Sequence, residues 1–133
     1  MLYPKLNEPV QLGAWGLRTR TAMAPLTRGF ADDITGVVSG ETSHYYKRRA
    51  EDGIGLIITE GTVISPRGKG IPGVPGIYSQ EQIASWEKVT EAVHKVNGTI
   101  ICQIWHVGRL SNRELTGGFA PQAPSPIPAQ GLV

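Results

Sequence analysis

The chain has 133 residues, of which 40% are hydrophobic and 18% charged, so its composition fits one small folded unit and excludes a disordered chain. A formal net charge of +2 argues against nucleic acid as the main partner, and no apolar stretch is long enough to cross a membrane. The single cysteine excludes an internal disulfide and a cysteine-rich zinc site, and the N-terminus has no signal-peptide core. These features predict a cytoplasmic protein.

The first part of the chain predicts two short β segments. Residues 10–20 are expected to form a hairpin with Gly13 and Gly16 in its turn. The sequence RTAMAPL, which follows directly, predicts a short strand that ends at Pro25.

A helix and a longer strand are expected next. Ser39 or Thr42 is suited to cap a helix that runs to about Asp52, where a glycine follows. The run GLIITEGT, residues 55–62, is β-branched, bounded by glycines and too short for a buried helix, so it predicts a strand.

The strongest helix signal begins at Ser79. Ser79 and Gln82 have the spacing of a capping box, and Asn97-Gly98 suits the end of the helix. One apolar stripe at spacings of three and four follows the cap: Ile83, Trp86, Val89, Val93 and Val96.

The last expected strand is TIICQIWHV, residues 99–107, in which Cys102 is expected to be an inert core thiol. Residues 117–133 hold four prolines and no periodicity, so they predict a loop. The order β-α-β-α-β after the hairpin predicts an α/β fold with parallel neighbouring strands. His44 and His94 have no second ligand at a useful spacing, so no metal site is expected.

Polar and aromatic residues gather where the expected strands end. In parallel α/β folds the carboxyl ends of the strands share one face, and that face binds ligands. Gln103 and Trp105 lie two residues apart and share one face of a strand, while Thr27 follows another strand end. Gly61 has no side chain, so a flat ligand could touch its backbone. The set suits a planar ligand with an amide edge.

The motifs MAPLTR, ITEGTVISPRGKG and CQIWHVGR resemble the Old Yellow Enzyme family, specifically its oxophytodienoate-reductase and N-ethylmaleimide-reductase branch. The similarity covers the whole chain in order, and three spaced motifs together are specific. The resemblance implies an FMN-dependent ene-reductase on a (β/α)8 barrel, with NAD(P)H as hydride source and an α,β-unsaturated carbonyl or nitro compound as substrate. It also implies that the hairpin plugs the bottom of the barrel.

The resemblance assigns the first motif to the flavin. Ala24, Pro25 and Leu26 would pack against the isoalloxazine ring, mostly through backbone. Thr27 would donate a hydrogen bond to the flavin carbonyl beside the reactive nitrogen, which favours the reduced ring.

The other two motifs would complete this part of the site. By the same resemblance Gly61 would bring a backbone N–H to the flavin edge, Gln103 would bind the pyrimidine part of the ring, and Trp105 would shape the substrate side. His106 and Arg109 are expected to pack and to anchor loops, with no catalytic role.

The sequence departs from the family in its extent. A (β/α)8 barrel takes about 250 residues, whereas residues 1–133 supply the hairpin, three strands and two helices. In the family the proton donor, the substrate-anchoring pair and the phosphate loops lie on later strands, so no catalytic residue is expected here.

The missing strands are expected to come from a second protein chain, because the inward faces of Ile57, Ile101 and Gln103 would otherwise meet water. Two alternatives stay open. The chain could be a non-catalytic barrel fragment or assembly module, or it could belong to a related flavin barrel such as a dienoyl-CoA reductase.

Overall fold

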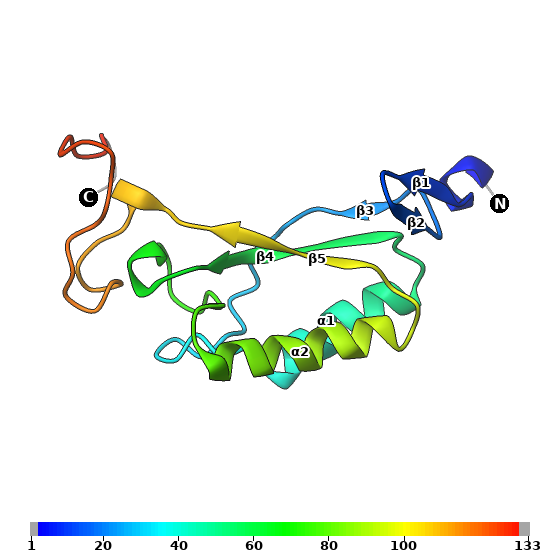
Figure 1. The fold of residues 1–133 in the computed structure, drawn as a ribbon, viewed down its shortest axis with the longest axis horizontal. Helices are drawn as coiled ribbons and strands as arrows, with labels where there is room; N and C mark the ends of the chain where they lie inside the picture. Colours follow the sequence, from blue (N-terminus) through cyan, green and yellow to red (C-terminus); the bar gives the residue numbers. More distant parts are fainter. Residues whose placement is uncertain (1–2, 131–133) are drawn as a thin grey trace.

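The computed structural model describes residues 3–130, which form a parallel sheet with two helices on one side and a separate hairpin (Figure 1). The elements in chain order are η1 (Pro4–Asn7), β1 (Val10–Leu12), β2 (Trp15–Leu17), β3 (Ala22–Met23), α1 (Gly40–Glu51), β4 (Leu56–Val63), η2 (Pro66–Gly68), α2 (Gln80–His94), β5 (Ile100–Trp105) and η3 (Gly108–Leu110), where η marks a 3-10 helix.

The hairpin of β1 and β2 lies at the end of the molecule where the parallel strands begin (Figure 1). Leu12 pairs with Trp15, so the turn consists of residues 13 and 14, and Gly13 takes a positive φ of 57°. The expectation that Gly16 also lies in the turn is wrong. Gly16 pairs with Gln11 inside the ladder, because a two-residue turn already reverses the chain.

The main sheet has the order β3-β4-β5, and both pairings are parallel, as the order of elements predicted. Ala22 pairs with Leu56 at one side of β4, and Ile57 pairs with Ile100 at the other. Within residues 3–130, β3 and β5 are each hydrogen-bonded to a strand on one side only, so the sheet is open at both edges.

A β-bulge interrupts β4 in its second half. Ile58 pairs with Ile101, but the next pair in register is Gly61 with Gln103, so two residues of β4 face one residue of β5. A bulge of this kind changes the face on which later side chains lie. It brings Gly61 onto the same face of the sheet as Gln103, and it lets the preceding Glu60 be buried.

Both helices pack on the same face of the sheet, and the core lies between them and the strands (Figure 1). The capping box of Ser79 and Gln82 is confirmed, and α1 begins after Ser39 as expected. Asn97 takes a positive φ of 56° after α2. The buried cluster consists of Val38, Tyr46, Ala50, Ile57, Trp86, Val89 and Val93.

Two expectations about strand faces are wrong. Ile57 is fully buried beneath the helices and does not lie on the inward face of the barrel. Cys102 is exposed and is not a core thiol. The reason is that α2 covers Ile100 at the beginning of β5, whereas no helix of residues 3–130 covers the later part of the strand, where Ile104 is 68% exposed. No helix in this part of the chain has the length and apolar character needed to cross a membrane.

Candidate functional site

The carboxyl end of β3 leads into the segment 24–27, which lies at the surface. Met23 packs against the core under the helices, whereas Ala24, Leu26 and Thr27 are exposed and Pro25 is half-buried. Leu26 is 56% exposed although it is apolar, so the segment presents an uncovered apolar wall followed by a hydroxyl.

The predicted neighbours Gly61, Gln103 and Trp105 are brought together on the opposite side of the sheet from the helices. Gly61 pairs with Gln103 across the strands, and the indole of Trp105 lies directly beside Gly61. A Cβ added to Gly61 would lie 2.2 Å from Cε3 of Trp105. The absence of a side chain at Gly61 therefore makes room for the indole of Trp105.

The backbone of Gln103 is held by a buried threonine at the bulge. The N–H of Gln103 donates to Oγ1 of Thr59 at 3.0 Å, and that hydroxyl donates to the carbonyl of Glu60 at 2.9 Å. The side-chain amide of Gln103 is exposed, and within residues 3–130 neither it nor the hydroxyl of Thr27 makes a hydrogen bond to protein. Both polar groups remain available to a ligand.

Glu60 is the residue of this region that sequence reasoning missed. It is 1% exposed, and its Oε2 accepts hydrogen bonds from the N–H groups of Arg28 at 2.9 Å and Gly29 at 3.4 Å. Burial raises the pKa of the Glu60 carboxyl, and these two hydrogen bonds together with the Arg28 charge oppose the rise. In the sequence, the one hint to Glu60 is its place directly before Gly61. Alternation along an unbroken strand does not predict that this carboxylate is buried, because the bulge in β4 changes the faces of the side chains.

Tyr46 reaches Glu60 from helix α1. The N–H of Glu60 donates to the phenol oxygen of Tyr46 at 2.8 Å, and burial raises the pKa of that phenol well above its usual range. Tyr46 is fully buried and belongs to the core cluster between the helices and the sheet.

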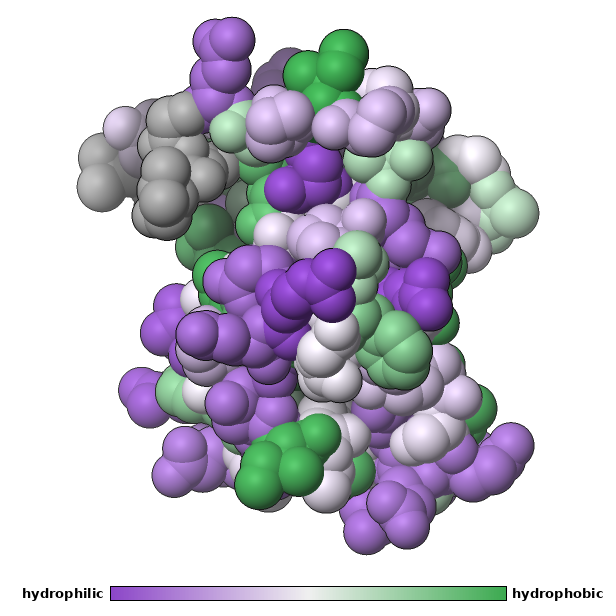
Figure 2. All heavy atoms as spheres, turned by 90° about the vertical axis from the view of Figure 1, so that its left-hand side faces the viewer, coloured by the Kyte–Doolittle hydropathy of each residue, from purple (hydrophilic) through white to green (hydrophobic). Residues whose placement is uncertain are grey.

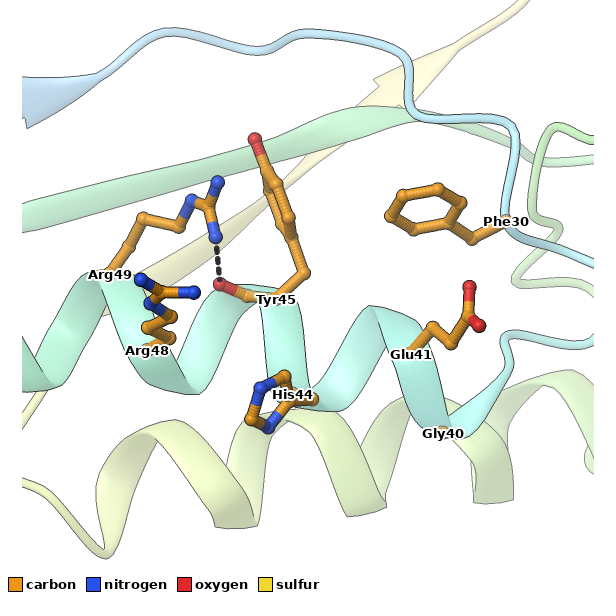
Figure 3. A pocket seen from close by; sticks show the side chains of 7 residues that line it. All are labelled: Phe30, Gly40, Glu41, His44, Tyr45, Arg48 and Arg49. Carbon is orange, nitrogen blue, oxygen red and sulfur yellow. Dashed lines mark hydrogen bonds between the residues drawn. The ribbon is translucent and has the colours of Figure 1, made fainter.

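A pocket of about 480 Å³ lies between α1 and the segment that follows β3, to which Phe30 belongs (Figure 3). Its aromatic wall is Phe30 and Tyr45, and the guanidinium of Arg49 stacks 3.4 Å from the Tyr45 ring centroid. Nη1 of Arg49 also donates to the carbonyl of Tyr45 at 3.1 Å. None of the flavin-site residues named from the sequence lines this pocket.

The residues that follow β5 anchor loops, as expected. Arg109 donates from Nη1 to the carbonyl of Ile127 at 2.7 Å and from Nη2 to Oγ of Ser125 at 3.1 Å. Nδ1 of His106 accepts from the N–H of Gly108 at 3.1 Å. Arg109 thereby ties the proline-rich segment, which contains no helix or strand in its described residues 117–130, to the end of the sheet. The expected loop residues 131–133 lie outside the described part.

The chemistry of this donor set fits a planar ligand with a polar edge. One end of the sheet presents an apolar wall, a free hydroxyl at Thr27, a free amide at Gln103 and an aromatic face at Trp105. Figure 2 looks onto this end of the molecule and shows hydrophilic and hydrophobic residues interspersed. Among residues 3–130 no group of three or more His, Cys, Asp or Glu side chains could hold a metal ion.

Comparison with known proteins relates this chain to flavin oxidoreductases. Residues 5–131 match the model of the NADH:flavin oxidoreductase / NADH oxidase family. The chain is 45% identical over 122 residues to 12-oxophytodienoate reductase 7 of Oryza sativa subsp. japonica, covering 92% of this chain and 29% of that protein.

Solved structures confirm the fold. The chain superposes on morphinone reductase in complex with tetrahydroNAD with a TM-score of 0.89 and 44% identity, over 96% of this chain and 34% of that one. The Old Yellow Enzyme homologue from Zymomonas mobilis gives 0.84 and 43%, over 92% and 33%. The chain thus spans about a third of the length of the proteins it matches. It has the fold of the N-terminal part of their (β/α)8 barrel, and it belongs to the NADH:flavin oxidoreductase / NADH oxidase family, as a relative of the Old Yellow Enzymes and 12-oxophytodienoate reductases.

Proposed function

We propose that this chain forms part of an FMN-dependent ene-reductase, which transfers a hydride from NAD(P)H by way of FMN to the double bond of an α,β-unsaturated carbonyl or nitro compound. The observation that carries the proposal is that the exposed Thr27 hydroxyl, the exposed Gln103 amide and the half-buried Trp105 indole lie at one end of the sheet in a chain of this family. We refer below to this chain, together with the strands that close its barrel, as the assembled enzyme.

The residues present fit one side of a flavin ring. Ala24, Pro25 and Leu26 offer an apolar wall on which a flat aromatic ring could lie, with Leu26 uncovered. When bound, FMN would supply the hydride chemistry that no side chain of this segment can supply.

The polar groups of the segment would orient the ring. The Thr27 hydroxyl would donate a hydrogen bond to the ring carbonyl beside the reactive nitrogen. The Gln103 amide can both donate hydrogen bonds to the pyrimidine edge and accept them from it. The Gly61 N–H would lie near the same edge, and Trp105 would limit the shape of alkenes that approach. Because the backbone of Gln103 is fixed by Thr59, its amide would be presented without a large loss of conformational freedom.

We further propose that a second chain supplies the remaining strands. Both edge strands of the described sheet have unpaired backbone groups on their outer sides, and the face opposite the helices exposes Gln103 and half-exposes Ile101. Open edges of this kind pair with further strands, and closing the barrel removes them. The phosphate site, the proton donor and the substrate-anchoring residues would come from that partner.

The test is a flavin spectrum and two half-reactions of the assembled enzyme. We expect bound FMN, reduction by NADPH or NADH under anaerobic conditions, and reoxidation by an α,β-unsaturated ketone. A colourless assembled protein would instead favour a non-catalytic barrel segment. An enzyme that turns over only dienoyl-CoA with the help of an iron-sulfur cluster would favour the related reductase class.

A single variant ties the activity to this chain. Thr27→Ala is expected to lower the flavin midpoint potential and slow flavin reduction, because a hydrogen bond to the reduced ring, of about 1–3 kcal/mol, is lost. Thr90→Ala is the matched control, since its hydroxyl donates within α2 to the carbonyl of Glu87 at 3.0 Å. An unchanged potential in Thr27→Ala would refute the role of Thr27.

A further inference from the structure

The buried carboxylate of Glu60 holds the backbone directly after Thr27. Its Oε2 accepts from the N–H of Arg28 at 2.9 Å and from the N–H of Gly29 at 3.4 Å. Its other oxygen, Oε1, is buried without a hydrogen-bond partner in the structure. Glu60 is 1% exposed, and burying a carboxylate costs free energy unless hydrogen bonds compensate for the lost water. The two hydrogen bonds to this loop therefore call for an explanation.

The loop has a second restraint on its far side. Gly29 takes a positive φ of 69°, and its backbone passes close to Gly73, where an added Cβ would lie 2.9 Å from the carbonyl oxygen of Gly29. The N–H of Ala31 donates to the carbonyl of Gly73 at 3.2 Å. The segment is therefore held between the sheet and the loop at residue 73, while Thr27 itself makes no hydrogen bond to protein in the described residues.

Glu60 is itself held firmly. Its N–H donates to the phenol of Tyr46 at 2.8 Å, and its carbonyl accepts from the hydroxyls of Thr59 at 2.9 Å and Thr62 at 3.1 Å. Tyr46 and both threonines are buried. A side chain mounted on a backbone with three such bonds can transmit position and not only fill space.

We propose that Glu60 is a positioning residue for the flavin site, whose carboxylate fixes the N–H groups of residues 28 and 29 and thereby sets where the Thr27 hydroxyl meets the flavin. This inference rests on the proposed function, because it gives Thr27 a ligand to meet. Glu60 touches neither flavin nor substrate in this scheme; it acts through the loop.

The experiment is a double-mutant cycle on the flavin midpoint potential of the assembled enzyme. Glu60→Ala removes the acceptor, and we expect the potential to fall in the same direction as in Thr27→Ala, with several-fold slower flavin reduction. Glu60→Gln keeps one oxygen for the two N–H groups and should stay close to the wild type. In the Thr27→Ala background, Glu60→Ala should cause no further shift, because the hydroxyl that it positions is already gone.

Each outcome of the cycle either supports or overturns the positioning role of Glu60. A shift by Glu60→Ala that persists in full in the Thr27→Ala background would mean that the carboxylate acts on the flavin by another route and would overturn the inference. No shift in Glu60→Ala, with a normal shift in Thr27→Ala, would overturn it while leaving the proposed function intact. An enzyme without FMN would overturn both. If Glu60→Ala does not fold, Glu60→Asp withdraws the carboxylate by one methylene, keeps the charge, and is read by the same cycle.

Discussion

The indole of Trp105 occupies the space that a side chain at Gly61 would need. The added Cβ would approach Cε3 at 2.2 Å and Cδ2 at 2.7 Å, both closer than carbon atoms can pack without movement. The two residues belong to neighbouring strands, and the bulge in β4 is what sets them on one face. The orientation of the Trp105 indole therefore depends on the absence of a side chain at Gly61.

Replacing Gly61 by alanine tests this relationship. We expect Gly61→Ala to lower the free energy of unfolding of the assembled enzyme by about 1–3 kcal/mol and to turn the indole away from the sheet. The measurement is urea denaturation, together with the NMR signal of the Trp105 indole N–H. Combined with Trp105→Ala, the same substitution should cost much less, because the clashing ring is absent.

Gly40 provides the matched glycine for this experiment. An added Cβ there meets no atom within 4 Å, and no positive φ is found at this position, so Gly40→Ala at the start of α1 should be neutral or mildly stabilising. If Gly61→Ala were equally harmless and left the indole signal in place, the close packing of the two residues would be refuted.

Trp105 should determine which alkenes fit the site while leaving flavin reduction nearly unchanged. Trp105 shares its face with Gln103 at the carboxyl end of β5, so its ring borders the space that a substrate would enter. We expect Trp105→Ile to change the relative rates across a panel of α,β-unsaturated compounds in the oxidative half-reaction. Trp15→Ile in the hairpin, at the opposite end of the sheet (Figure 1), is the control. An identical substrate profile for Trp105→Ile and wild type would make Trp105 a packing residue only.

Much of this fold can be predicted from short sequence patterns, because caps, turns and the order of elements depend on residues that are close in the sequence. The capping box at Ser79, the left-handed Asn97 and the parallel order of the strands all follow from neighbours in the sequence. What fails is the assignment of side chains to faces. Alternation in an unbroken strand cannot foresee the bulge before Gly61, and the apolar character of Cys102 and its neighbours says nothing about whether a helix covers them.

The same limit explains why only some residues of the candidate site could be named from the sequence. Thr27 could be named because it follows a strand end, and Gln103 and Trp105 because they share one face near the end of β5; all three lie in family motifs. Glu60 could not, since its role depends on a long-range contact with residues 28 and 29, which lie more than thirty positions earlier in the chain. Only the folded chain brings an acidic residue of one strand to the loop that follows another.

The burial of Glu60 predicts a pH dependence of stability. Its folded-state pKa is raised above the ordinary value of 4.5, chiefly by burial, against the opposing bonds from Arg28 and Gly29 and the Arg28 charge. Tyr46, the other titratable group that contacts it, stays protonated throughout this range. The folded state therefore binds the Glu60 proton more tightly than the unfolded state does, and the resulting stability is present below pH 4.5 and is lost as the pH rises through the raised pKa.

We expect Glu60→Gln to lack this decline, so that its free energy of unfolding, measured by urea denaturation of the assembled enzyme from pH 4.5 upward, changes less than that of the wild type. Asp32 and Asp33 do not interfere in this window. Hydrogen bonds from Thr35 and Lys69 lower their pKa values below 3.8, so their contributions are lost only at more acidic pH. Parallel curves for the variant and the wild type would contradict the assignment.

The isolated 133-residue chain should not behave as a monomeric flavoprotein. Both edges of its sheet are unpaired within residues 3–130, and the exposed apolar side chains include Leu26, Ile104 and Leu110, each more than half exposed. Hydrophobic burial contributes about 25 cal/mol per Å² and a domain is stable by only about 5–15 kcal/mol, so surfaces of this kind favour association. We expect size-exclusion chromatography with light scattering to give oligomers or aggregates without bound FMN.

Coexpression with the strands that close the barrel should give a discrete yellow complex. In that complex the thiol of Cys102, which is exposed in this chain, should react more slowly with a thiol reagent because a helix then covers its face of β5. A cooperatively folding monomer that binds FMN by itself would show that the open edges need no partner, and the proposal of a second chain would have to be abandoned.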